Sequence, residues 1–339
     1  MGYILSPEAA DRLIASLADD CLVFAPKRFV GGAVFSDLDC IRYGEVKTAG
    51  EIVFDQKSDY SFKEILTPVC QALFYFTEDQ IKEADAPEKG AVVFLRSCDL
   101  HAVKRLDDIY LNNGEEDYYY RRLRDRVKFV VMGCSEAFDS CFCVDMGTNV
   151  PEGYNMSMEP AEGGFAIDCR DAELDELLGS LADRECDVEP SHVEETKTRV
   201  KIPEGLTQDV MRSKIWDEYD GRCIACGRCN FVCPTCTCYT MQDLFYTENG
   251  RVGERRRVQA SCMVDGFTDV AGGGSYRKKN GERMRFKTLH KALDYKQRFG
   301  YQMCVGCGRC DDVCPEYISF SRILNRLGDM MEEVNTDAE

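Results

Sequence analysis

Two short runs of cysteine stand out in the second half of this chain. Residues 223–233 read CIACGRCNFVC and residues 304–314 read CVGCGRCDDVC, and a proline follows each run. Both runs therefore have the spacing C-x2-C-x2-C-x3-C-P. Three cysteines at this spacing let one loop supply thiolates to three corners of an iron–sulfur cube. The pattern predicts two [4Fe–4S] clusters.

The ligands of these clusters are expected to cross between the runs. The fourth cysteine of such a run, which precedes the proline, points away from its own loop and ligates the other cluster. A glycine follows the second cysteine of each run, where a missing Cβ lets the backbone curl close to sulfur. The predicted ligands are Cys223, Cys226, Cys229 and Cys314 for the first cluster, and Cys304, Cys307, Cys310 and Cys233 for the second.

Zinc is the competing occupant of the two runs. A four-cysteine zinc site needs two C-x2-C pairs and gains nothing from a third cysteine or from the terminal proline. Haem c would require C-x-x-C-H, which the sequence lacks, and the histidines at 101, 192 and 290 are not placed for a Rieske centre. We therefore favour iron–sulfur clusters and keep a zinc-stabilised interaction module as an alternative.

Three further cysteines lie close to these runs in sequence. Cys236 and Cys238 follow the first run directly, and Cys262 follows the basic stretch RVGERRR at 251–257. With one outside ligand they could hold an additional metal centre. Because only three sulfurs are available, we favour packing as small apolar groups. The basic stretch fits a solvated face or a docking patch for an acidic partner.

Another group of cysteines accompanies two predicted strands in the first half. The apolar runs AVVFL at 91–95 and VKFVVM at 127–132 predict buried strands, and Cys98 and Cys134 come shortly after them. In open parallel sheets, ligands bind beyond the carboxyl ends of the strands. If the two strands are parallel neighbours, both cysteines reach one place, and the loop SCFC at 140–143 can fold back to it.

These positions predict a third [4Fe–4S] cluster on Cys98, Cys134, Cys141 and Cys143, with Asp99 as a possible oxygen ligand. The competing interpretation is four unrelated structural cysteines, since free cysteine is often buried. The five cysteines at 21, 40, 70, 169 and 186 show no grouping and are interpreted as structural.

The elements that position these residues suggest two domains. Strands alternate with a helical pattern at 101–111, and Asp171 is predicted to cap a helix that buries leucines at 174, 177, 178 and 181. We predict an α/β N-terminal domain at 1–190, which carries the third site. A polar linker leads to a mostly α-helical, ferredoxin-like dicluster domain at 210–330.

Composition restricts the function. The 339 residues carry a formal net charge of -18, which disfavours binding to nucleic acid or to anionic membranes. No leader and no apolar run long enough to span a bilayer is visible, so we expect a cytoplasmic protein, in which cysteines are more often metal ligands than disulfides. The sequence also lacks G-x-G-x-x-G and P-loop motifs and any recognisable catalytic group. It predicts electron transfer without a site for bond-making.

The chain resembles the iron–sulfur A subunits of anaerobic sulfite reductases. The resemblance runs over nearly the whole length and rests on RSCDLHAVKRLDDIYLNNG, SCFCVDMGTN, RCIACGRCNFVCPTCTCY, ASCMVDGF and MCVGCGRCDDVCP. It implies one partner subunit that binds a flavin and oxidises NADH, and another whose sirohaem reduces sulfite to sulfide. This chain would pass electrons between them. The β subunits of cytosolic NAD(P)-linked hydrogenases have a similar architecture and provide the alternative function.

Overall fold

The computed structural model describes residues 2–33 and 36–336. The chain forms two compact units, and each unit is assembled from separate stretches. The first contains Met1–Leu66, Pro87–Lys197 and Val305–Cys307, and the second contains Thr67–Ala86, Thr198–Cys304 and Gly308–Glu339. These units differ from the predicted domains 1–190 and 210–330 in two short stretches, and the domain boundaries stay a prediction.

A five-stranded sheet forms the centre of the first unit. Its strand order is β3-β2-β6-β7-β8, and all neighbours are parallel except β2 and β3. The predicted strands at 91–95 and 127–132 are β6 and β7, which are parallel neighbours, as the α/β prediction required. The strands span Cys21–Phe29 (β2), Cys40–Glu45 (β3), Gly90–Leu95 (β6), Val127–Val131 (β7) and Met156–Ser157 (β8).

Both faces of this sheet are covered, which explains the continuous apolar character of β6. Val92 and Phe94 contact a core that includes Leu13 of helix α1 (Pro7–Asp20). Val93 and Leu95 point to the opposite core, which includes residues of α3 (Ser97–Tyr110). Alternate side chains of a strand face opposite sides, so a strand buried on both sides needs apolar residues at every position. Helices α2 (Lys63–Leu66) and α4 (Tyr118–Arg124) complete this region.

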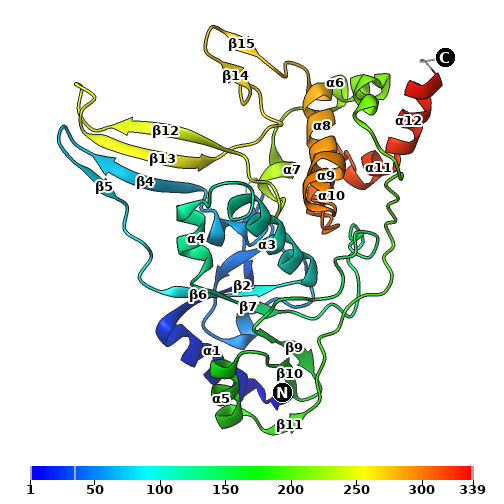
Figure 1. The fold of residues 1–339 in the computed structure, drawn as a ribbon. Coiled ribbons are helices and arrows are strands. Elements are labelled where there is room, and N and C mark those ends of the chain that lie inside the picture. The colour runs from blue at the N-terminus through cyan, green and yellow to red at the C-terminus, as the bar shows by residue number, and fades with distance from the viewer. Residues whose placement is uncertain (1, 34–35, 337–339) are drawn as a thin grey trace. The chain divides into compact units, whose positions relative to one another are not determined.

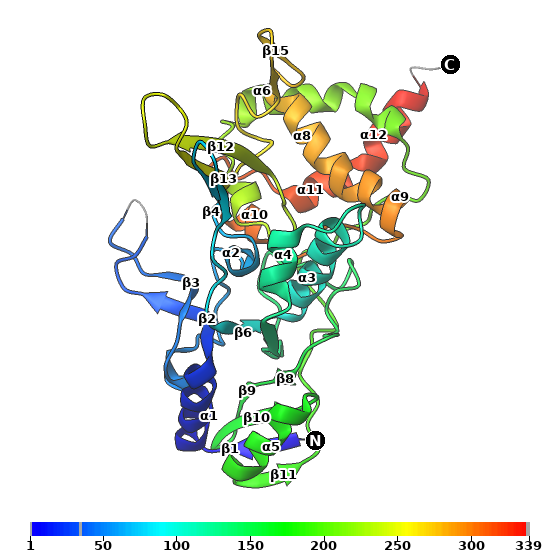
Figure 2. The same ribbon diagram turned by 60° about the vertical axis from the view of Figure 1, so that its left-hand side comes forward.

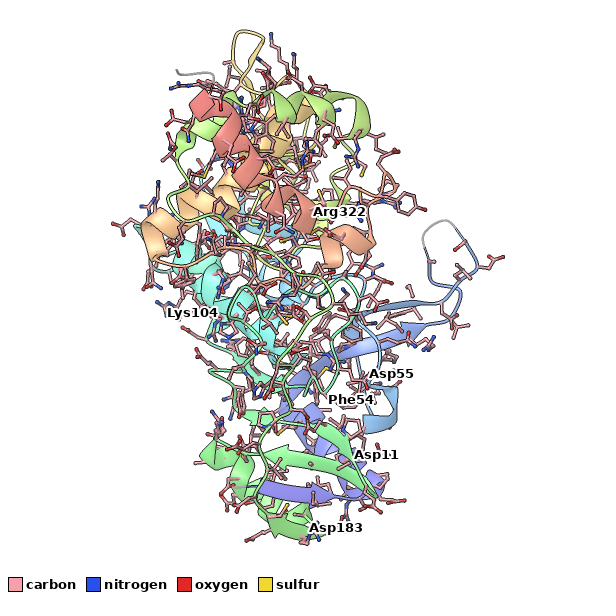
Figure 3. All side chains as sticks on the ribbon, turned by 90° about the vertical axis from the view of Figure 1, so that its right-hand side faces the viewer. Asp11, Phe54, Asp55, Lys104, Asp183 and Arg322 are labelled. Carbon is pink, nitrogen blue, oxygen red and sulfur yellow. The ribbon has the colours of Figure 1, made fainter. Side chains whose placement is uncertain are left out.

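A second, antiparallel sheet in the same unit has the order β11-β1-β10-β9. Helix α5 (Ala172–Leu181) lies beside it, next to α1 (Figure 1). Asp171 caps α5 by accepting hydrogen bonds from two backbone N–H groups, as predicted. Asp11 of α1, labelled in Figure 3, accepts a 2.8 Å hydrogen bond from the backbone of Ala49 in η1 (Ala49–Glu51). The strands are Gly2–Leu5 (β1), Glu159–Ala161 (β9), Gly164–Asp168 (β10) and Arg184–Cys186 (β11).

The second unit contains an antiparallel sheet that was not predicted from the sequence. Its order is β12-β13-β4-β5, and Figure 2 shows β12, β13 and β4 side by side. The edge strand β12 is exposed along its whole length. The predicted basic patch coincides largely with β13, where Arg255 pairs with Asp243 at 2.7 Å. The strands are Cys70–Phe76 (β4), Ile81–Glu83 (β5), Tyr239–Phe245 (β12) and Gly253–Gln259 (β13).

The rest of the second unit is built mainly from short helices, as predicted for a ferredoxin-like domain. Figure 1 shows α8 and α9 as one continuous column, joined by the π-helical segment η4. No helix within residues 2–33 and 36–336 has the length and apolar character that crossing a membrane requires. The helices are Gln208–Arg212 (η2), Lys214–Asp217 (η3), Glu218–Arg222 (α6), Arg228–Phe231 (α7), Asn280–Leu289 (α8), His290–Asp294 (η4), Tyr295–Phe299 (α9), Arg309–Asp312 (α10), Phe320–Asn325 (α11) and Leu327–Thr336 (α12), and a small ribbon joins Asp269–Val270 (β14) to Gly274–Ser275 (β15).

Candidate metal centres

The two cysteine runs adopt the same local backbone. Each has a glycine in the left-handed conformation immediately before a short helix, with φ of 75° at Gly227 and 72° at Gly308. A Cβ added at Gly227 would lie 2.7 Å from Val264 Cγ2. Glycine is therefore required at this position on two grounds, the positive φ and the close packing. The tight turn of the first run lets its first three cysteines line one cavity.

Cysteines from both runs line one cavity. The first three cysteines of the first run meet Cys314 there, and Cys310 lines it as well. Burial raises the pKa of Cys223, and the charges of Cys229, Cys226 and Cys314 raise it further. Thiolates that repel one another in an apolar cavity are stabilised by a cationic iron core, so the donor set fits a [4Fe–4S] cluster. The apolar lining comes from Met263, Met284, Ile318, Phe320 and Ile323.

The cysteines of the second predicted set lie in three structural settings. Cys233 Sγ lies 3.4 Å from Thr235 Oγ1. The negative charges of Cys233 and Cys304 both raise the pKa of Lys291. Cys310 lines the cavity already described. Cys307 belongs to the first unit, where its carbonyl accepts a 3.1 Å hydrogen bond from Lys57 Nζ. The assignment of ligands to individual clusters stays a prediction.

Three basic side chains of the second unit are buried along one helical column, and two of them lie beside these cysteines. Arg283, Lys287 and Lys291 are each less than 5 % exposed and follow one another at four-residue intervals along α8 and η4. Lys287 lines the cysteine cavity, and Lys291 Nζ donates a 2.8 Å hydrogen bond to Thr235 Oγ1. The burial of these residues was not predicted from the sequence. Their helical spacing in a stretch that also buries Met284, Leu289 and Ala292 was the available signal.

Cys236, Cys238 and Cys262 are brought near the first run. Cys238 directly precedes β12 and Cys262 follows β13, so pairing of these strands places the two cysteines at one end of the ribbon. A hydrogen bond from the Cys238 thiol, with one from Asn230 Nδ2 at 3.1 Å, holds the pKa of Cys262 below its usual value. Hydrogen bonding to Cys233 and burial raise the pKa of Cys236. A further metal centre on these three residues stays a prediction.

The N-terminal cysteines gather at the carboxyl ends of β6 and β7. Leu95 and Val131, which end these parallel strands, lie opposite each other. Burial raises the pKa of Cys134 and, to about 12, that of Cys143, and the charge of Cys141 raises both further. The structure therefore brings Cys134, Cys141 and Cys143 together.

Cys98 lies in the first turn of α3 and packs against the core that contains Leu95 and Leu100. Asp99, the predicted oxygen ligand, is fully buried, and its charge contributes to the raised pKa of Cys134. The third cluster on these four cysteines stays a prediction. Across residues 2–33 and 36–336, no group of three or more His, Cys, Asp or Glu side chains is arranged to hold a metal ion.

Arg96 organises this N-terminal group and was not singled out from the sequence. Its guanidinium donates a 2.5 Å hydrogen bond to the carbonyl of Gly133 and lies 3.7 Å from Cys134 Sγ. It also donates to the carbonyl of Phe54, which Figure 3 labels. A buried cation beside Cys134 favours the thiolate form that metal binding requires.

The stretch Val305–Cys307 packs on the SCFC loop within the first unit. The backbone N–H of Phe142 donates to the carbonyl of Gly306 at 2.8 Å, and Thr148 Oγ1 donates to the carbonyl of Val305 at 2.7 Å. Gly306 has a φ of 66°, and an added Cβ would lie 2.6 Å from the backbone of Phe142. This contact fixes the loop that carries Cys141 and Cys143.

Comparison with known proteins agrees with the chemistry of the second unit. Residues 222–318 match the family model described as a 4Fe-4S dicluster domain. The matched region contains all eight cysteines of the two runs. The match confirms the prediction of a dicluster domain and indicates two [4Fe–4S] clusters.

A relative extends the similarity beyond this domain. Over 302 residues the chain is 28% identical to the protein named sulfhydrogenase 2 subunit beta of Pyrococcus furiosus, which covers 84% of this chain and 88% of that protein. No solved structure gives a significant match to the chain. Similarity to a protein named as a sulfhydrogenase β subunit agrees with the alternative function better than with the sulfite reductase function.

Proposed function

We propose that the chain is the iron–sulfur electron-transfer subunit of a multi-subunit oxidoreductase. It would relay electrons from a flavin subunit that oxidises NADH to a separate catalytic subunit. The observation that carries this proposal is the apolar cavity in which Cys314 joins the first three cysteines of the other run. A dicluster domain match over both runs supports the same function.

The residues of this chain would hold and insulate the redox centres. When bound, [4Fe–4S] clusters supply one-electron redox centres whose potentials depend on surrounding charge, hydrogen bonds and burial. Cys223, Cys226, Cys229 and Cys314 would hold one cluster, and Cys304, Cys307, Cys310 and Cys233 the other. The apolar side chains Met263, Ile318 and Phe320 would keep water away from the first set.

The N-terminal group supports a third centre, on Cys98, Cys134, Cys141 and Cys143. Three of these thiols are mutually close, and the buried Arg96 opposes the effect of burial on Cys134 by favouring the ionised form of that thiol. The full-length chain should then bind about 12 irons, and the double variant C134A/C141A about eight, as two cubes would. Anaerobic reconstitution followed by iron and sulfide counts measures this. An equal iron content in both proteins would contradict a third cluster and assign these cysteines a structural role.

The terminal reaction is that of a hydrogenase or that of a sulfite reductase, and a different observation favours each. The sulfhydrogenase relative favours a hydrogenase as the terminal enzyme. The motifs SCFCVDMGTN and PTCTCY resemble sulfite reductase A subunits, which favours a sirohaem subunit as the acceptor. Both assign the same role to this chain, so the hydrogenase and the sulfite reductase differ in their partner subunits.

Anaerobic purification of the native complex through a tag on this chain tests the proposal. Mass spectrometry of the co-purified subunits, with assays of NADH-dependent sulfite reduction and of hydrogen evolution, would identify the terminal reaction. The isolated chain reduced by dithionite should produce neither sulfide nor hydrogen. Either product from the isolated, cluster-loaded chain would contradict the electron-transfer role. A chain that binds only zinc would support the interaction module instead.

A further inference from the structure

Lys287 and Lys291 present an energetic problem in the second unit. Both side chains are buried, with 4% and 3% exposure, and they lie four residues apart, so they project from one face of the α8–η4 column. Cysteine side chains lie beside both lysines, because Lys287 shares a cavity with Cys229 and Cys310, and Lys291 reaches Cys233 through Thr235. A buried ammonium group is costly unless a negative charge compensates it. The compensating charge must therefore come from the cysteine sites.

The contacts of each lysine identify which cysteines it faces. Lys287 lines the cavity that contains Cys229 and Cys310. Lys291 Nζ donates to Thr235 Oγ1, which in turn lies 3.4 Å from Cys233 Sγ. The side chain of lysine carries a positive charge at neutral pH. Two fixed positive charges thus lie beside the predicted cluster ligands.

We propose that Lys287 and Lys291 are the counter-charges of the two clusters and raise their reduction potentials. This inference rests on the proposed function, because it requires clusters at these cysteines. One-electron reduction adds a negative charge to a cluster, and a nearby buried cation stabilises the reduced form more than the oxidised one. Removing either charge should make the neighbouring cluster harder to reduce.

The two lysines should act on different clusters. Lys291 Nζ donates to Thr235 Oγ1, which lies 3.4 Å from Sγ of Cys233, a member of the second predicted set. Lys287 lines the cavity that contains Cys229 of the first set and Cys310 of the second. Replacing Lys291 should therefore shift mainly one cluster, whereas replacing Lys287 should shift both.

The experiment is a redox titration of the full-length, anaerobically prepared protein, followed by EPR. Lys287→Met and Lys291→Met remove the charges and preserve an unbranched side chain. We expect each to reduce the equilibrium constant for one-electron reduction about tenfold, which corresponds to about 59 mV toward more negative potential. The control is Lys296→Met, which removes an exposed charge from the same column and should leave both potentials unchanged. Lys287→Arg and Lys291→Arg keep the charge and should retain most of the wild-type potential.

The outcomes separate this inference from the proposed function. Wild-type protein without iron and without an EPR signal would refute the clusters themselves. Wild-type protein with two clusters whose potentials are unchanged in both methionine variants would overturn the role of the lysines alone. A methionine variant could fold without taking up iron while its arginine variant takes up iron. The positive charge would then be required during assembly, and this result would support the inference. Failure of both variants to take up iron would indicate a requirement for shape and overturn it.

Discussion

At the scale of single residues, the order of the cysteines along the chain predicts the ligands of each cluster, which the number of cysteines alone would not. The second cysteine run supplies Cys314 to the cavity lined by the first three cysteines of the other run. This arrangement agrees with crossed ligation, in which the last cysteine of each run serves the other cluster.

Cys229→Ala and Cys233→Ala should therefore damage different clusters, although the two residues are only four positions apart. Cys229→Ala removes a ligand from the set that includes Cys314, and Cys233→Ala removes one from the set that includes Cys304. EPR spectra of the reduced full-length variants would show which signal is lost. Loss of the same signal in both variants would contradict the crossed assignment.

A second prediction at this scale concerns His290, whose ring stacks on Phe286 at a centroid distance of 5.6 Å. Burial, followed by the charges of Lys291 and Arg277, lowers its pKa to about 4. Because its pKa is about 6.5 in the unfolded chain, the unfolded state binds more protons between these two values. The titration of His290 therefore leaves the free energy of unfolding unchanged above about pH 6.5. It lowers this free energy as the pH falls from about 6.5 toward about 4.

His290→Gln removes the titrating group and should lessen the loss of stability at mildly acidic pH. The measurement is the midpoint of thermal unfolding at about pH 7.5 and about pH 5.5, since histidine titrates within this range. His192→Gln, at an exposed histidine, is the matched control and should keep the wild-type difference. An equal drop in wild-type protein and in His290→Gln would exclude His290 as its source.

At the scale of elements, the cap of α5 shows how one side chain fixes the start of a helix. Asp171 accepts from the backbone N–H groups of Glu173 and Leu174 and lies 3.0 Å from Lys128 Nζ. Asp171→Ala should lower the free energy of unfolding by about 1–2 kcal/mol, the cost typical of a lost cap. Urea denaturation of both proteins measures the difference. Glu176→Ala, at an exposed position of the same helix, should change stability by less than about 0.5 kcal/mol.

The elements also show what could be predicted from the sequence and what could not. The continuous apolar run of β6 predicted a doubly covered parallel strand, and the spacing of the two cysteine runs predicted a dicluster domain, since both signals are local. The pairing of β4 with β13 escaped prediction because it joins residues far apart in the chain, such as Cys70 and Val258. Lys287 and Lys291 escaped it because burial of a charged side chain depends on tertiary packing.

At the scale of the whole molecule, the two compact units are interleaved along the chain. Thr67–Ala86 belongs to the second unit although residues of the first unit flank it on both sides, and Val305–Cys307 belongs to the first. A cut near residue 190 would therefore separate β4 and β5 from their sheet partners. We expect the fragment 1–190 to be less soluble than the full-length chain, because unpaired strands promote association. Light scattering of both purified proteins would test this, and a monodisperse fragment would contradict it.

The same interleaving has a consequence for how the protein is made. A ribosome releases β4 long before it has synthesised β13, which pairs with β4 and lies more than half the chain's length further on. At synthesis rates of about 5–20 residues per second, β4 waits for its partner for about ten seconds or longer. Cys304 to Cys314, which complete both predicted ligand sets, emerge later still. Both predicted ligand sets are thus complete only once Cys314 has been synthesised, and a nascent chain needs protection of its early strands until then.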